Sequence, residues 1–191
     1  MITKRQLIAA FIVVVLIAVA FFIAGCGPGA KPEKLATGKE YDSATLWNSL
    51  AALDAGNKTP INLSSAWYAE VNSRALASFN GRFRADLSKR GIPVSNVTGN
   101  SGWDQRFNCT FFAEGYIYFA AVEFYLEQFH SDGRAAKLAI AEIWYKPDAA
   151  VNRHAVVYML TDTGEKFIEP ITGQELAMST TERHSISLRK L

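Results

Sequence analysis

Residues 109–129 read CTFFAEGYIYFAAVEFYLEQF, an apolar and aromatic segment with only three charged side chains. Phe112, Tyr116, Ala120 and Phe124 recur at every fourth position, which places them on one face of an α-helix. Asn108, or a residue close to it, can cap the first turn of this helix. The segment therefore predicts a largely buried central helix that begins at Cys109.

The residues before this segment predict two further helices. Leucines at helical spacing predict one helix over residues 43–55. A second is expected from about Ser65 to Gly91-Ile92-Pro93, a combination that is typical of a helix end. Its apolar face would carry Trp67, Val71, Ala75, Leu76, Phe79, Phe83 and Leu87. Residues 94–106 are rich in Asn, Ser and Gly and predict a loop.

The residues after the central helix change to a strand pattern. Strands are expected over residues 137–145, 154–160, 166–169 and 185–191, with a turn at 161–164 between the second and the third. Helices followed by such a run of strands predict an α+β fold, in which the helices, including the one opened by Cys109, precede an antiparallel sheet.

The N-terminal residues predict an export signal. Lys4 and Arg5 precede an uncharged run over residues 7–25, and this run ends in Ile23-Ala24-Gly25-Cys26. That ending resembles the lipobox of bacterial lipoproteins, in which the cysteine is lipidated and becomes the new N-terminus. The alternative is an uncleaved transmembrane helix, for which the run is nearly long enough. Either anchor places the rest of the chain on the extracytoplasmic face of a membrane, in the cell envelope.

The organisation of the rest of the chain follows from its composition. Residues 27–40 are rich in Gly, Pro and Lys and predict a flexible tether. Residues 41–191 then form a single domain, a size that 191 residues in total allow. Once residues 1–25 are set aside, basic and acidic residues are equal in number. A neutral domain gives no electrostatic reason to expect nucleic acid as a partner.

Three residues of the domain suggest nucleophilic catalysis. Cys109 would open a helix, whose N-terminus favours a thiolate. His154 starts one strand and Glu169 ends the next, so the hairpin between them brings both to the same end. Cys109 would be the nucleophile, His154 its base and Glu169 the carboxylate that orients the base. The alternatives are a buried, inert cysteine, a histidine bound to a carbonyl and an exposed turn carboxylate.

A family resemblance adds to this interpretation. Residues 102–119, GWDQRFNCTFFAEGYIYF, and residues 154–174, HAVVYMLTDTGEKFIEPITGQ, resemble the transglutaminase-like branch of the papain-like cysteine peptidases. The resemblance implies a Cys-His-acid triad of Cys109, His154 and Glu169. It also implies an oxyanion-hole donor, for which Gln105 is the candidate, beside the backbone N–H of Cys109.

Two functions follow as hypotheses. The first is a membrane-tethered cysteine hydrolase or acyltransferase that acts on amide bonds of a peptide or protein substrate. The second is a non-catalytic lipoprotein that binds an envelope or surface protein with the same fold, of which a phage-derived blocker is one form. We expect no cofactor and no metal, because the cysteines and histidines lack the compact spacing of a zinc site.

Overall fold

The computed structural model describes residues 33–53, 63–92, 94, 108–128, 134–150 and 152–190. All of them belong to one compact unit, Glu33–Leu191. The predicted lipobox with Cys26, the uncharged run before it and the oxyanion candidate Gln105 lie outside the described residues. Among the described residues, no helix combines the length and apolar character that crossing a bilayer requires.

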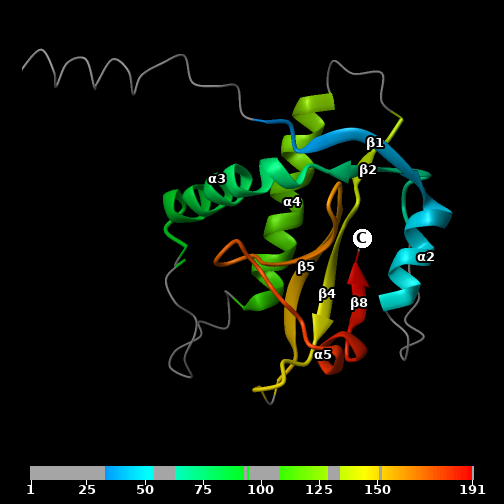
Figure 1. The fold of residues 1–191 in the computed structure, drawn as a ribbon. Helices are drawn as coiled ribbons and strands as arrows, with labels where there is room; N and C mark the ends of the chain where they lie inside the picture. Colours follow the sequence, from blue (N-terminus) through cyan, green and yellow to red (C-terminus); the bar gives the residue numbers. More distant parts are fainter. Residues whose placement is uncertain are drawn as a thin grey trace, which may run out of the picture. The chain divides into compact units, whose positions relative to one another are not determined.

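The described residues of this unit form four α-helices and eight strands (Figure 1). The helices are α2 (Ser43–Leu53), α3 (Leu76–Lys89), α4 (Cys109–Gln128) and the short α5 (Thr180–His184), with a 3-10 turn at Ser73–Ala75 before α3. The strands are β1 (Ala36–Asp42), β2 (Trp67–Val71), β3 (Lys137–Leu138), β4 (Ile140–Tyr145), β5 (His154–Thr161), β6 (Gly164–Glu169), β7 (Gln174–Glu175) and β8 (Ser187–Lys190).

The sheet is mixed, so the predicted antiparallel sheet that follows the helices is wrong. Its main path runs β1-β2-β5-β4-β8, with β3 beside β2, and β6 and β7 continuing from β5. β2 pairs in parallel with β3 and, through Val71 and Thr161, with β5. The other pairs are antiparallel. Two strands from the N-terminal half therefore join the sheet, and one of them lies next to its centre.

The missed strand β2 has a physical explanation. Four of its five residues are buried, so it lacks the alternation of apolar and polar residues that marks a half-buried strand. Trp67 and Val71 also continue the four-residue spacing of the real helix α3, which begins only at Leu76. Similarly, the predicted tether ended at residue 40, whereas β1 begins at Ala36 and pairs with β2. The folded unit thus starts earlier than its polar sequence suggested.

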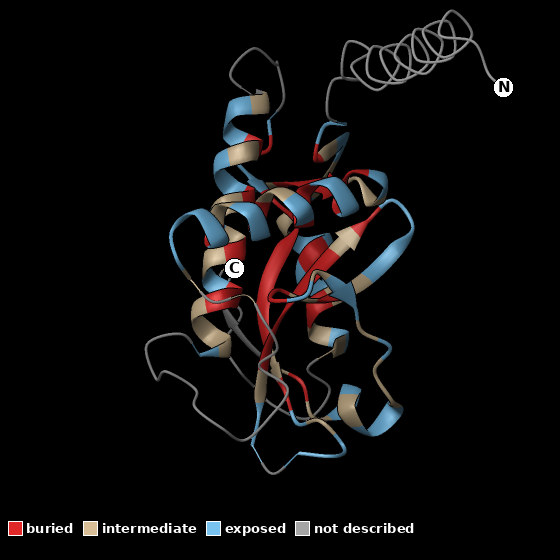
Figure 2. Ribbon diagram, turned by 90° about the vertical axis from the view of Figure 1, so that its left-hand side faces the viewer, coloured by how far each residue is buried: buried red, intermediate tan, exposed pale blue. Residues whose placement is uncertain are grey.

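Two hydrophobic cores lie on the two faces of the sheet. On one face, α3 and α4 pack against alternate residues of β5 (Ala155, Val157 and Met159). On the other, Leu46 and Leu50 of α2 pack with Val156 and Tyr158 of the same strand. β5 is therefore buried on both faces for most of its length (Figure 2). This burial fixes the register of the strand that His154 opens.

The central helix was predicted correctly, within one residue at its C-terminus. α4 packs along β5 (Figure 1), with Phe112, Tyr116, Ala120 and Phe124 all buried. Near its end, the two carboxylate oxygens of Glu127 accept hydrogen bonds from the backbone N–H groups of Leu35 and Ala36, at 2.6 and 3.4 Å. The first residues of the folded unit are therefore held at the C-terminal end of α4.

Candidate active site

Cys109 occupies the first turn of α4, as predicted, and it is half-buried. Asn108 caps the turn: its side-chain oxygen accepts a hydrogen bond from the N–H of Phe111 at 2.9 Å. Its carbonyl oxygen accepts the first helical bond, from Phe112 at 3.2 Å. The cap places the Cys109 thiol beside the unpaired N–H groups of the helix, where negative charge is stabilised.

His154 and Glu169 meet at one end of the β5–β6 hairpin. His154 begins β5 and Glu169 ends β6, and the turn between the strands sets their antiparallel register. The Nε2 atom of His154 lies 2.5 Å from Oε2 of Glu169, a short hydrogen bond between two largely buried side chains. The imidazole therefore has one nitrogen fixed by a carboxylate, and Nδ1 is the nitrogen left for Cys109.

The thiol and the imidazole interact directly. Burial alone would raise the pKa of Cys109, but hydrogen bonds with the His154 side chain and with the backbone of Ala155 and Thr110 lower it overall. Burial alone would lower the pKa of His154, but its hydrogen bonds with Cys109 and Glu169 raise it from 6.5 to about 9. These contacts thus favour a thiolate and an imidazolium, the reactive form of a cysteine nucleophile.

The structure brings together the three residues that the sequence predicted as a triad. His184, the other histidine that the structure describes, lies exposed on α5. Gln105 and His130 lie outside the described residues. Within the part of the chain that the structure describes, no group of three or more His, Cys, Asp or Glu side chains could hold a metal ion.

Sequence reasoning missed two contributors to the site. The Tyr145 ring stacks edge-on against His154, with the ring centroids 6.0 Å apart, and its own pKa is raised to about 12, mainly by burial. Asn80 is a buried polar residue that binds the turn after Glu169. The sequence feature that could have pointed to Asn80 is its place as the one polar residue between Phe79 and Phe83 that α3 buries.

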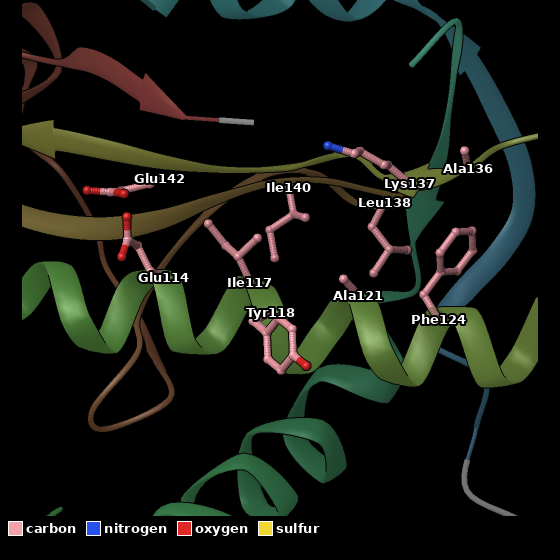
Figure 3. Close-up of a pocket in the computed structure, with 10 residues that line it drawn as sticks. All are labelled: Glu114, Ile117, Tyr118, Ala121, Phe124, Ala136, Lys137, Leu138, Ile140 and Glu142. Carbon is pink, nitrogen blue, oxygen red and sulfur yellow. The ribbon is translucent and has the colours of Figure 1, made fainter. Parts of the chain in front are cut away.

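A separate groove runs beside α4 (Figure 3). Its cavity volume is about 280 Å³, and it is lined mainly by apolar side chains of α4, β3 and β4. At one end, the carboxylates of Glu114 and Glu142 approach each other from the helix and the sheet (Figure 3). Cys109, His154 and Glu169 do not line it, so the groove is distinct from the candidate active site.

Comparison with known proteins adds structural likeness only. No protein-family model matches the chain, and no curated protein matches its sequence. Among solved structures, it is similar to PSL1a in a complex with E64, with a TM-score of 0.54 and 17% identity over 78% of this chain. It is also similar to the Polyporus squamosus lectin bound to the epitope Neu5Aca2-6Galb1-4GlcNAc, with a TM-score of 0.51 and 15% identity over 79% of this chain. The chain spans about half of each of these proteins, 49% and 48%.

These matches correct the predicted classification. The two similar structures named above are lectins, which contradicts the transglutaminase-like and papain-like assignment and the description as a cysteine peptidase or hydrolase. The mixed sheet agrees with this correction, because that assignment implied an antiparallel one. At such low identity the likeness concerns the fold alone, and function has to be argued from the site.

Proposed function

We propose that the protein is an enzyme that transfers acyl groups through a thiolate, with Cys109 as the nucleophile. The observation that carries the proposal is the continuous contact from Cys109 to His154 and from His154 to Glu169. Each of the three residues has a distinct role in this proposal. The carboxylate fixes the imidazole, and the imidazole holds the proton that the thiol has given up.

The reaction that this geometry suits has two steps. The Cys109 sulfur attacks the carbonyl carbon of an amide, a C–S bond forms, and the His154 imidazolium donates its proton to the departing amine as the C–N bond breaks. An acceptor nucleophile then gives a proton back to His154 and attacks the thioester, which releases the thiolate. Backbone N–H groups at the start of α4 are the donors available to the oxyanion.

The proposal can be tested with E64, because PSL1a, to which this chain is similar over about half of PSL1a, forms a complex with it. E64 carries an epoxide, which a thiolate opens to give a stable thioether. We expect peptide mapping of the full chain to find the adduct on Cys109. We also expect it to form at least about tenfold faster in the native protein than in the denatured one. Cys109→Ser is the control. Equal rates in native and denatured protein would overturn the proposal.

The proposed location is the extracytoplasmic face of a membrane. It rests on the basic residues, the uncharged run and the Ile23-Ala24-Gly25-Cys26 ending at the N-terminus. We expect mass spectrometry of the membrane fraction to find a lipid on Cys26. We expect no lipid on the Cys26→Ser protein. An unmodified Cys26 in a chain that still sediments with membranes would identify an uncleaved transmembrane helix instead.

A second candidate function is binding without catalysis. The likeness to lectins supports a glycan or protein partner, and an envelope or surface protein is the finer form of this candidate. Immobilised Neu5Aca2-6Galb1-4GlcNAc is a rational first glycan probe. Binding that survives Cys109→Ser, together with a thiol that is no more reactive in the native protein, would favour this candidate over acyl transfer.

A further inference from the structure

A buried polar contact joins both helices of one core to the turn that follows Glu169. The side-chain Nδ2 of Asn80 on α3 donates a hydrogen bond to the carbonyl oxygen of Gly173 at 2.7 Å. The hydroxyl of Tyr116 on α4 donates to Oδ1 of the same Asn80. We call Asn80, Tyr116 and Gly173 the Asn80 bracket. Asn80 is only 9% exposed and Tyr116 is fully buried, so the hydrogen bond between them is shielded from water.

The turn that is hydrogen-bonded to Asn80 also forms hydrogen bonds with Glu169. The N–H of Gly173 donates to the backbone carbonyl of Glu169 at 2.7 Å. The N–H of Ile171 donates to Oε1 of the same glutamate at 3.2 Å, which leaves Oε2 for His154. The position of this turn therefore sets both the backbone and the carboxylate orientation of Glu169.

The bracket fits closely. Gly173 has a φ of +71°, and a Cβ atom there would lie 2.8 Å from Cβ of Asn80, too close for any real contact. On the other side, Phe79 and Phe83 pack edge-on against the Tyr116 ring, at centroid distances of 4.9 and 5.1 Å. The glycine lets the turn approach α3, and the aromatic packing keeps the Tyr116 hydroxyl directed at Asn80.

The bracket thus connects two parts of the candidate active site. Tyr116 is on the helix that Cys109 opens, two turns further along, and Gly173 closes the turn that holds Glu169. Among the described residues, the pairing of β6 with β5 ends at Ile168, and Glu169 itself pairs with Gln174 of the two-residue strand β7, so the turn is a main restraint on Glu169. A shift of the turn relative to α4 would move the carboxylate away from His154.

We propose that Asn80 is a positioning residue, which acts through Gly173 to hold the Glu169 carboxylate against His154 and so keeps the His154–Cys109 pair reactive. The inference rests on the proposed function, because it assigns Asn80 a role in that same site. Asn80 touches neither Cys109 nor any reacting atom in this arrangement. Its effect passes through the turn and the carboxylate.

The test compares Asn80→Asp with wild type in the full chain. The substitution keeps the size of the side chain but sets a carboxylate oxygen against the Gly173 carbonyl, where a donor is needed. We expect the rate of Cys109 alkylation by iodoacetamide at pH 6 to fall about 3- to 10-fold, because less of the thiol is ionised. We also expect His154, followed by NMR, to lose its ring proton at a lower pH than in wild type.

Two further variants separate positioning from stability. Leu87→Ala removes a buried side chain from the same helix without touching the bracket, and it is used at a temperature where its folded fraction matches that of Asn80→Asp. It should leave the pH profile of Cys109 alkylation unchanged. Tyr116→Phe removes only the hydroxyl that Asn80 accepts from, and it should shift the profile in the same direction as Asn80→Asp but less.

The outcomes distinguish this inference from the proposed function. A wild-type profile in both Asn80→Asp and Tyr116→Phe, or an equal shift in Leu87→Ala, overturns the positioning role while the thiolate enzyme stands. If Asn80→Asp does not fold, Tyr116→Phe alone decides the question. If the pH dependence of Cys109 alkylation in the wild-type protein is that of an ordinary thiol, the proposed function itself is overturned.

Discussion

Replacing His154 with alanine is expected to slow the alkylation of Cys109 by iodoacetamide at pH 6 by about 10- to 100-fold. The imidazole provides the main interaction that lowers the pKa of Cys109 against the opposing effect of burial. Without it, burial favours the neutral thiol, and little thiolate remains at pH 6. The fall in alkylation rate is smaller than the fall in thiolate concentration, because a more basic thiolate is also a better nucleophile.

The measurement is the second-order rate from pH 5 to pH 10, with the modified peptide identified in each sample. His184→Ala is the matched control, because His184 is exposed on α5, a different element from those that carry Cys109, His154 and Glu169. The control should follow the wild-type curve throughout. Identical curves for wild type and His154→Ala would mean that the contact seen here does not ionise Cys109.

Replacing Glu169 with glutamine should lower the pH at which His154 loses its ring proton by about one unit or more. In the wild-type protein, contacts with Cys109 and Glu169 raise the pKa of His154 to about 9. A neutral amide removes the negative charge that stabilises the imidazolium but can still accept a hydrogen bond. The charged form of the His154 ring becomes less favourable, so the pKa of His154 falls toward 6.5.

NMR of the ring carbon-bound protons of His154 would follow this titration, with iodoacetamide rates measured in parallel. Between the new and the old pKa of His154, the imidazolium is lost and the proton donor for a leaving group is lost with it. Glu175→Gln is the control, because Glu175 is exposed and pairs with Lys166 in the same region. A titration unchanged from wild type in Glu169→Gln would show that the carboxylate does not support the imidazole electrostatically.

The parts of the fold that the sequence predicted are those with a strong local signal. The four-residue repeat of α4 and the alternation of β5 both survive in the structure, since each has one face or both faces buried in a regular way. The Thr161–Gly164 turn fixed the hairpin register, and with it the approach of His154 to Glu169. The three candidate catalytic residues were found because they lie at the ends of these regular elements.

The sequence could not predict the long-range pairing. β2 is a short buried segment whose apolar residues fit a helix as well as a strand, so only its partners decide its conformation. Its parallel contact with β5 joins Val71 to Thr161, residues that no local pattern relates. Asn80 illustrates the same limit in the site, because its partner Gly173 lies far along the chain and contributes only a backbone carbonyl.

The hydrogen bonds of Glu127 to Leu35 and Ala36 have a mechanical consequence. Cys109 and Glu127 lie near opposite ends of α4, and at 1.5 Å per residue they are separated by about 27 Å along the axis. A force applied at Leu35 would therefore act on α4 at the end that is far from Cys109. The Cys109 thiol therefore lies most of the length of α4 away from the place where Leu35 and Ala36 are held, so a bulky molecule can approach the thiol without contacting these two residues.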